Sequence, residues 1–298
     1  MNLILTAPFG ELVTAMVTPF KENGEVNYEK AAELARHLVE NGSDALVVAG
    51  TTGESPTLTQ EEKLELYRTV VSAVKGKAKV VAGTGSNNTA QAVKLTRLAA
   101  ECGVDGVMLV VPYYNKPSQE GIYQHFATII AETELPVMLY NVPGRTVVNM
   151  SAETTLRLAE LPNVVAIKEA SGDLEQMALI RKKAPQDFAV YSGDDCMTLP
   201  VLAVGGSGVV SVAAHVAGKD MKKMISAYHA GDTATALQLH LRLLPLFNVM
   251  FISPNPCPVK GALNLLGHNL GPVRLPLVEL TDSERKEIDN VLTGLGYL

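Results

Sequence analysis

The sequence has only three cysteines, Cys102, Cys196 and Cys257, and they lie far apart. They form no C-x-x-C pair and no cluster with histidine, which argues against a structural zinc site. Their odd number also argues against a disulfide framework, so we expect reduced cysteines in a cytoplasmic protein. The lone acidic pair Asp194-Asp195 is better explained as a helix cap than as a metal ligand. We therefore predict no metal site.

Long apolar runs and an excess of positive charge are also missing. No run reaches the roughly 20 apolar residues that a membrane helix needs. The short run at residues 3–5 lacks the preceding basic region and the length of a signal peptide. The 25 Lys and Arg residues against 31 Asp and Glu give a net charge of −6. We expect a cytoplasmic protein that binds neither nucleic acid nor a membrane, because a mildly acidic chain has no electrostatic attraction to either.

The sequence does contain eight short apolar or β-branched runs that alternate with longer amphipathic segments. The runs span residues 12–17, 45–49, 79–83, 106–110, 136–141, 164–168, 188–192 and 208–212. Several are apolar almost throughout, as expected for parallel strands covered on both faces. Their spacing of roughly 20 to 35 residues fits repeated βα units. The pattern predicts an α/β protein with a (β/α)8 barrel over residues 1–232, with an open doubly wound sheet as the alternative.

Helical spacing appears between these runs and again after the last one. Apolar faces are formed by Ala31, Leu34, Ala35 and Leu38, by Leu64, Tyr67, Val71 and Val74, and by Ala92, Leu95, Ala99 and Cys102. Thr59 and Ser118 each precede a glutamate-containing helix start, as N-caps do. Residues 233–251, 259–266 and 283–292 follow without further strands. We predict that residues 233–298 form a small helical C-terminal domain that packs on the barrel.

Functional groups of such a barrel lie at the carboxyl ends of its strands, and Lys168 stands out there. It closes the apolar run 164–167, and because side chains alternate along a strand, Lys168 and Glu169 point to opposite sides. An amine inside the barrel is desolvated, which disfavours its charged form and makes it a usable nucleophile. A lysine that reaches the rim or pairs with a carboxylate is the alternative.

Four other strand-end residues are candidates for the same site. Tyr140 lies one strand away and could move protons, although a packed aromatic residue is the simpler explanation. Thr51 and Thr52 stand between two glycines and could present hydroxyls and amides to a carboxylate, or merely cap a helix. Arg145 could bind a carboxylate with both arms of its guanidinium, or lie in solvent.

Taken in order, these strand ends resemble a known enzyme family. The segments are GTTGE at 50–54, PYYNKP at 112–117, YNVPGRT at 140–146, IKEA at 167–170 and PNPCPVK at 254–260. From about residue 10 to the end, the chain looks like the pyruvate-dependent class I aldolase superfamily. Within it, the chain resembles the dihydrodipicolinate synthases. The resemblance implies condensation of pyruvate with L-aspartate 4-semialdehyde to 4-hydroxy-tetrahydrodipicolinate, in lysine and diaminopimelate biosynthesis.

The resemblance also implies a role for each matching residue. Lys168 forms the imine with pyruvate and no cofactor is needed, while Tyr140 is the general acid and base. Thr51 and Tyr114 complete the proton relay, with Tyr114 reaching into a neighbouring subunit of a homotetramer built as a dimer of dimers. Thr52, Gly193 and Val210 line the pyruvate pocket. Arg145 receives the carboxylate of the second substrate.

A possible effector site follows from the same resemblance. Ser55, Asn87 and Tyr113 match the site at which lysine-inhibited members bind lysine. Gln60 and Lys63 stand where those members have histidine, and Gln91 stands where they have glutamate. Loss of a carboxylate and gain of an ammonium disfavour a cationic ligand, so we expect weak or absent inhibition by lysine.

Two other functions stay open at this point. An N-acetylneuraminate lyase, or an aldolase or dehydratase for 2-keto-3-deoxy sugar acids, would keep Lys168 and Tyr140 but would need polyol contacts. The doubled threonine Thr51-Thr52 and the position of Arg145 favour the semialdehyde reaction. The alternative of another class is a non-catalytic binding protein on an inherited barrel, which the fold alone does not exclude.

Overall fold

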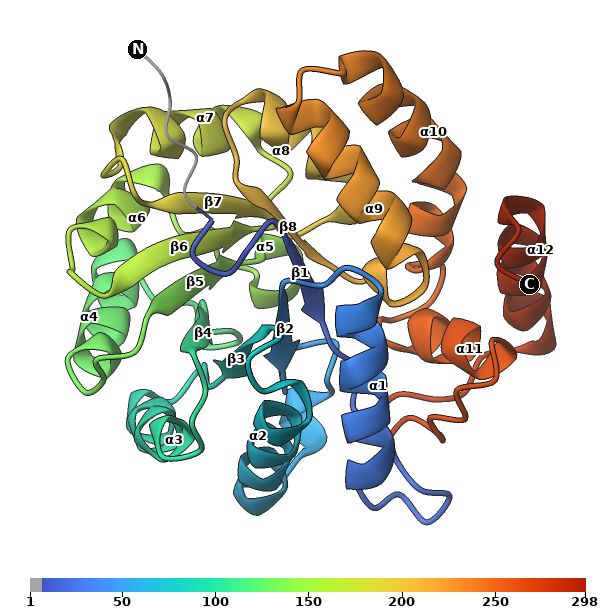
Figure 1. The fold of residues 1–298 in the computed structure, drawn as a ribbon. Coiled ribbons are helices and arrows are strands. Elements are labelled where there is room, and N and C mark those ends of the chain that lie inside the picture. The colour runs from blue at the N-terminus through green and yellow to red at the C-terminus, as the bar shows by residue number, and fades with distance from the viewer. Residues whose placement is uncertain (1–6) are drawn as a thin grey trace.

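The computed structural model describes residues 7–298, and the short apolar run at 3–5 lies outside these residues. Eight parallel strands close into a barrel in chain order, as predicted (Figure 1). The strands are β1 Leu12–Ala15, β2 Ala45–Val48, β3 Lys79–Gly83, β4 Gly106–Val110, β5 Val137–Asn141, β6 Val164–Glu169, β7 Ala189–Ser192 and β8 Gly208–Ser211. β8 pairs with β1 to close the ring, which excludes the open doubly wound sheet.

Helices surround the barrel, and most of them follow the strand that precedes them in the chain. The longer ones are α1 Tyr28–Glu40, α2 Gln60–Val74, α3 Thr89–Ala100, α4 Gln119–Ile130, α6 Ala152–Ala159, α7 Leu174–Lys183, α8 Thr198–Ala203 and α9 Ala214–His229. Short turns of helix occur at η1 Ser55–Thr57, α5 Pro143–Thr146 and η2 Asp195–Met197. Thr59 and Ser118 are N-caps as predicted, and Thr59 forms a capping box with Glu62.

The buried residues form two clusters separated by the sheet. One fills the barrel interior, with Val13, Met138, Ala166 and Tyr191 among its members. The larger cluster lies between the outer face of the strands and the helices. Alternating strand residues therefore serve two different cores, which explains why the strands are apolar almost throughout.

The predicted core face of α2 is partly wrong. Leu64 and Val71 are only half-buried, whereas Leu66 and Val70 are buried together with Tyr67 and Val74. The Tyr67 hydroxyl donates a 2.8 Å hydrogen bond to the carbonyl of Gly83. The buried face of the helix is therefore centred slightly differently from the predicted one, and it includes one polar group that is satisfied by the barrel.

Three further helices follow the barrel, α10 Thr233–Val249, α11 Cys257–Leu265 and α12 Asp282–Leu295. α10 packs beside α9, and α12 packs against α10 and α11. Figure 1 shows these helices on one side of the barrel. A C-terminal helical region is confirmed, while the division into domains at residues 232 and 233 stays a prediction. Within residues 7–298, no helix is long and apolar enough to cross a membrane.

Candidate active site

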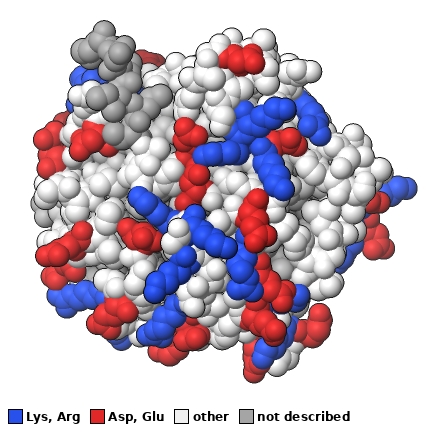
Figure 2. Space-filling view, viewed as in Figure 1, with Lys and Arg blue, Asp and Glu red and all other residues white. Residues whose placement is uncertain are grey.

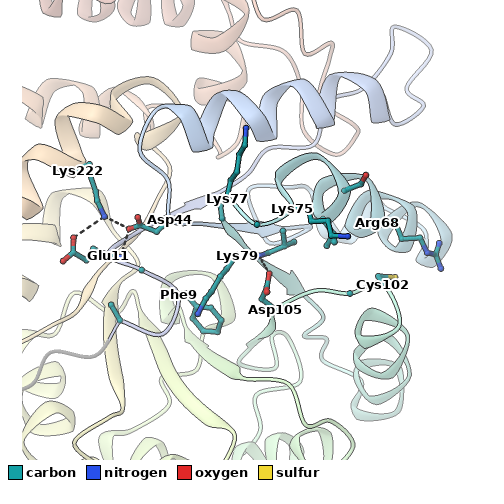
Figure 3. A pocket seen from close by; sticks show the side chains of 18 residues that line it. Phe9, Glu11, Asp44, Arg68, Lys75, Lys77, Lys79, Cys102, Asp105 and Lys222 are labelled. Atoms are coloured by element: carbon teal, nitrogen blue, oxygen red, sulfur yellow. Dashed lines mark hydrogen bonds and ion pairs between the residues drawn. The ribbon is translucent and has the colours of Figure 1, made fainter.

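Two cavities lie at opposite ends of the barrel, and only one has the residues for chemistry. The cavity at the amino ends of the strands has a volume of about 960 Å³. Some of its charged groups are engaged, since Lys222 binds Asp44 at 2.6 Å and Lys79 donates to the backbone carbonyl of Pro8. Lys75, Lys77 and Lys79 point in different directions around it (Figure 3). Figure 2 shows basic and acidic side chains intermixed on one face of the molecule.

The second cavity has a volume of about 680 Å³ and opens at the carboxyl ends of the strands. Thr51, Tyr140 and Arg145 line it, together with Met108 and Val110 of β4. This size is typical of a pocket for small molecules, and this end of a barrel is where active sites form. We refer to this cavity as the cleft.

Lys168 lies inside the barrel, near the carboxyl end of β6 and beside Tyr140 of β5. Lys168 is 5% exposed, and its Nζ lies 4.3 Å from the centre of the Tyr140 ring. The two residues are direct partners in the register of β5 and β6, so they share the same height and the same side of the sheet. Among the described residues, no carboxylate lies within 4.0 Å of Lys168 Nζ. The alternative of a lysine held by a carboxylate is therefore excluded within residues 7–298.

Gly193 lies directly against Lys168 after β7, and Val210 lies in the barrel interior on β8. A β-carbon added at Gly193 would lie 3.1 Å from Cε of Lys168 and 2.6 Å from the Ala170 side chain. Only glycine therefore fits there without displacing the lysine. Val210 is buried in the interior cluster and pairs with Val13 of β1. Neither residue lines the cleft, and their role in substrate binding stays a prediction.

The two threonines after β2 have different surroundings. Thr51 lines the cleft, whereas Thr52 is 3% exposed and its hydroxyl accepts a 2.9 Å hydrogen bond from the Asn255 side chain. Asn255 comes from the loop that precedes α11, and its Oδ1 is buried without a partner in the described structure. The loop before α11 therefore contacts the carboxyl end of β2 and holds the side chain of Thr52 in place.

A buried ion pair anchors the same turn. Glu54 and Lys260 of α11 form a 3.1 Å ion pair with almost no exposure of either side chain. The second carboxylate oxygen of Glu54 accepts the backbone N–H of Arg274, and Lys260 also donates to the carbonyl of Pro272. Burial lowers the pKa of Lys260, and the Glu54 carboxylate opposes this shift. The C-terminal helices therefore hold the turn that carries Thr51 and Thr52.

Arg145 projects from the short helix α5 into the rim of the cleft. The helix spans Pro143–Thr146, and its C-cap residue Val147 adopts a left-handed backbone with φ of 64°. Arg145 is exposed, and no side-chain hydrogen bond or ion pair to another described residue restrains its guanidinium. Its five N–H donors are therefore free to bind an acid group in the cleft.

Among the predicted catalytic residues, Thr51 and Tyr140 line the cleft and Lys168 is buried against Tyr140, whereas Tyr114 lies outside the cleft. Its side chain is 88% exposed, and its φ of 74° lies in a region that bulky residues rarely adopt. Its neighbour Tyr113 lines the cleft and accepts a hydrogen bond from Asn87 through its carbonyl. Ser55 also lines the cleft, whereas Asn87 contributes only through Tyr113.

Two buried carboxyl groups were missed or misjudged from the sequence. Asp194 caps η2 as predicted, but Asp195 is buried and accepts the backbone N–H groups of Val212 and Ala213. Burial raises its pKa. Glu169, on the outer side of β6, accepts hydrogen bonds from Asn141 and Gln176, and burial raises its pKa too. Both carboxyl groups connect strand ends that surround Lys168, and local sequence patterns do not reveal such distant partners.

Comparison with known proteins gives one consistent result. The dihydrodipicolinate synthetase family matches residues 8–295. A 4-hydroxy-tetrahydrodipicolinate synthase of Bacillus subtilis is 59% identical to the chain, over 96% of this chain and 99% of the relative. The match therefore covers the barrel and the C-terminal helices alike.

Solved structures agree with this relationship. A dihydrodipicolinate synthase of Bacillus anthracis is 55% identical, covers 96% of this chain and 98% of its own, and superposes with a TM-score of 0.94. The enzyme of Cyanidioschyzon merolae, solved with lysine bound, is 52% identical, covers 98% and 100%, and reaches a TM-score of 0.97. Since the family match spans nearly the whole chain and the relatives match over nearly their full length, the chain belongs to the dihydrodipicolinate synthetase family.

Proposed function

We propose that Lys168 condenses with pyruvate and that the resulting enamine attacks L-aspartate 4-semialdehyde. The observation that carries this proposal is a buried lysine that has no carboxylate partner within residues 7–298 and packs against Tyr140 at the end of β6. A lysine amine is the nucleophile that forms a Schiff base with a ketone such as pyruvate. The covalent imine takes the place of a cofactor, and the proposal includes no metal.

The reaction balances with the groups that surround Lys168. Attack of the amine on the ketone of pyruvate and loss of one water give the imine. The imine is a better electron sink than the ketone, so a proton leaves the methyl carbon and an enamine forms. The enamine carbon attacks the aldehyde, and the amino group of the semialdehyde then attacks the imine carbon. Ring closure frees Lys168 and yields 4-hydroxy-tetrahydrodipicolinate.

Several proton transfers in this sequence need a group that both donates and accepts. We assign this role to Tyr140, with Thr51 as the next hydroxyl in the relay, because both line the cleft. Tyr114 is the third member, contributed by a second copy of the chain within a homotetramer. Its exposure and its left-handed backbone support this assignment, since a strained, exposed aromatic residue gains contacts when a partner covers it.

The substrate carboxylates are divided between two places. We assign the pyruvate carboxylate to Thr52 and the surrounding turn, with Gly193 and Val210 closing the pocket around Lys168. Arg145 binds the carboxylate of the semialdehyde, since it lines the cleft and its guanidinium bonds to no other side chain in the part of the chain that the structure describes. A cytoplasmic location stays a prediction.

Lysine inhibition is expected to be weak or absent in this chain. Lys63, Gln60 and Gln91 line the cleft near Ser55 and Tyr113. An ammonium group close to the expected effector site repels a cationic ligand, and no carboxylate lines the cleft within the part of the chain that the structure describes.

Tyr140→Phe tests the assignment of the proton-transfer group. The substitution keeps the ring that packs on Lys168 and removes only the hydroxyl, so the folded state should be preserved. We expect kcat to fall by about 10²- to 10⁴-fold, the usual contribution of a general acid and base. Steady-state kinetics with pyruvate and L-aspartate 4-semialdehyde measure this effect. A variant with unchanged kcat would contradict the role of Tyr140, whatever its effect on KM.

A further inference from the structure

The outer part of the cleft has more positive charge than the proposed reaction uses. Lys63 of α2, Lys94 of α3 and Arg145 of α5 line the cleft. No Asp or Glu lines it among the described residues. This contrasts with a whole-chain net charge of −6. The cleft is therefore a local region of positive potential in an acidic protein.

Lys63 is the more unusual of the two lysines, because it is half-buried and has no counter-ion. Burial lowers its pKa, and no carboxylate lies within 4.0 Å of its Nζ among residues 7–298. None of the acidic residues of its own helix, Glu61, Glu62 and Glu65, forms an ion pair with Lys63. Glu62 binds Arg274 with both carboxylate oxygens, and Glu65 faces Arg68. An ammonium that is partly removed from water without a partner is costly, unless a ligand supplies the negative charge.

Lys94 increases the same imbalance from the neighbouring helix. α3 has no acidic residue along its length, so nothing on that helix neutralises Lys94. Ser55, Gln91 and Tyr113 line the cleft near these lysines and can donate hydrogen bonds from a hydroxyl or an amide. The outer cleft therefore combines two unpaired cations with neutral donors, which is the composition of an anion site.

The substrates do not account for these two charges. In the proposed function, on which this inference rests, Thr52 and its turn receive one carboxylate and Arg145 receives the other. Lys63 and Lys94 are then left without an acid group. Because they line one cleft from two different helices, a ligand with two separated acid groups offers one carboxylate to each lysine.

We propose that Lys63 and Lys94 form a binding site for a small dicarboxylate in the outer cleft, distinct from the reaction centre at Lys168. Ser55, Gln91 and Tyr113 provide its neutral donors. The ligand is an anion, whereas lysine carries an ammonium side chain. A site lined by lysines therefore favours a dicarboxylate, while a site lined by a carboxylate would favour an amine. Since the site and the reaction centre share one cleft, a bound dicarboxylate disfavours the entry of anionic substrates and raises the KM of pyruvate.

Calorimetric titration with succinate tests this proposal, using acetate at equal ionic strength as the single-charge control. The protein is first reduced with borohydride in the presence of pyruvate, which occupies the reaction centre and leaves only the outer cleft for the titrant. We expect succinate to bind at least tenfold more tightly than acetate. In the Lys63→Gln/Lys94→Gln variant, succinate affinity should fall at least tenfold.

The matched control is Lys75→Gln/Lys77→Gln. It removes the same two charges from exposed positions at the opposite end of the barrel, and it should bind succinate as the unchanged protein does. Equal succinate binding by the two double variants would overturn the proposal, as would the absence of binding to the unchanged protein. If borohydride does not trap pyruvate, the proposed function is contradicted instead. The succinate site is then tested by titrating the untreated protein and both double variants.

Discussion

Lys168→Ala is expected to lower kcat/KM by about 10⁴-fold or more, because no other group replaces the amine that forms the imine. Lys168 sits 4.3 Å above the ring of Tyr140 and directly against Gly193, so the substitution leaves a small gap but no broken ion pair. Steady-state assays with both substrates measure the loss.

The folded state should survive this substitution, which makes the kinetic result easy to interpret. Lys168 is buried and has no carboxylate partner among residues 7–298, so its replacement breaks no ion pair and the melting temperature should stay the same or rise. Lys168→Met is the matched control, since it keeps most of the apolar stem and lacks the amine. Either variant with more than a few per cent of the original turnover would contradict the assignment of Lys168.

Lys260→Met is expected to destabilise the protein by about 3–5 kcal/mol, because it leaves Glu54 as a buried charge without its counter-ion. Lys260 Nζ lies 3.1 Å from the Glu54 carboxylate and also donates to the carbonyl of Pro272. Chemical denaturation measures the free energy of unfolding. The turn that carries Thr51 and Thr52 should lose its anchor, so KM for pyruvate should rise as well.

A double-mutant cycle provides the control for the ion pair. Glu54→Gln/Lys260→Met removes both charges, so most of the lost stability should return. The backbone N–H of Arg274 still finds an acceptor in the glutamine carbonyl. If the single and double variants are equally unstable, the pair does not act as a unit, and Lys260 stabilises the fold mainly through its packing over Phe20.

The barrel could be predicted from the sequence because each βα unit repeats a local pattern. Eight apolar runs, their spacing and the caps at Thr59 and Ser118 are all features of short segments, and the structure confirms them. Most strand boundaries agree, and the others differ by a residue or two, as for 12–17 against Leu12–Ala15. The placement of Lys168 beside Tyr140 followed from strand alternation together with the closed strand order.

The remainder of the site depends on contacts between distant segments. Glu54 and Lys260 are 206 positions apart, and Asn255 and Thr52 are 203 positions apart. Neither pair leaves a periodic signal in the sequence. The buried face of α2 likewise includes a contact that the local pattern does not show, between the Tyr67 hydroxyl and a carbonyl of β3. For Tyr114, a single chain shows only exposure and backbone strain, so its role depends on a second copy.

The most direct test of the central claim is borohydride reduction of the protein in the presence of pyruvate, followed by peptide mass spectrometry. Reduction of the imine should add about 72 Da to the peptide that contains Lys168, the mass of pyruvate less one water plus two hydrogens. Lys168→Ala should give no adduct under the same conditions. An unmodified Lys168 peptide, or an adduct on another lysine, would contradict the account.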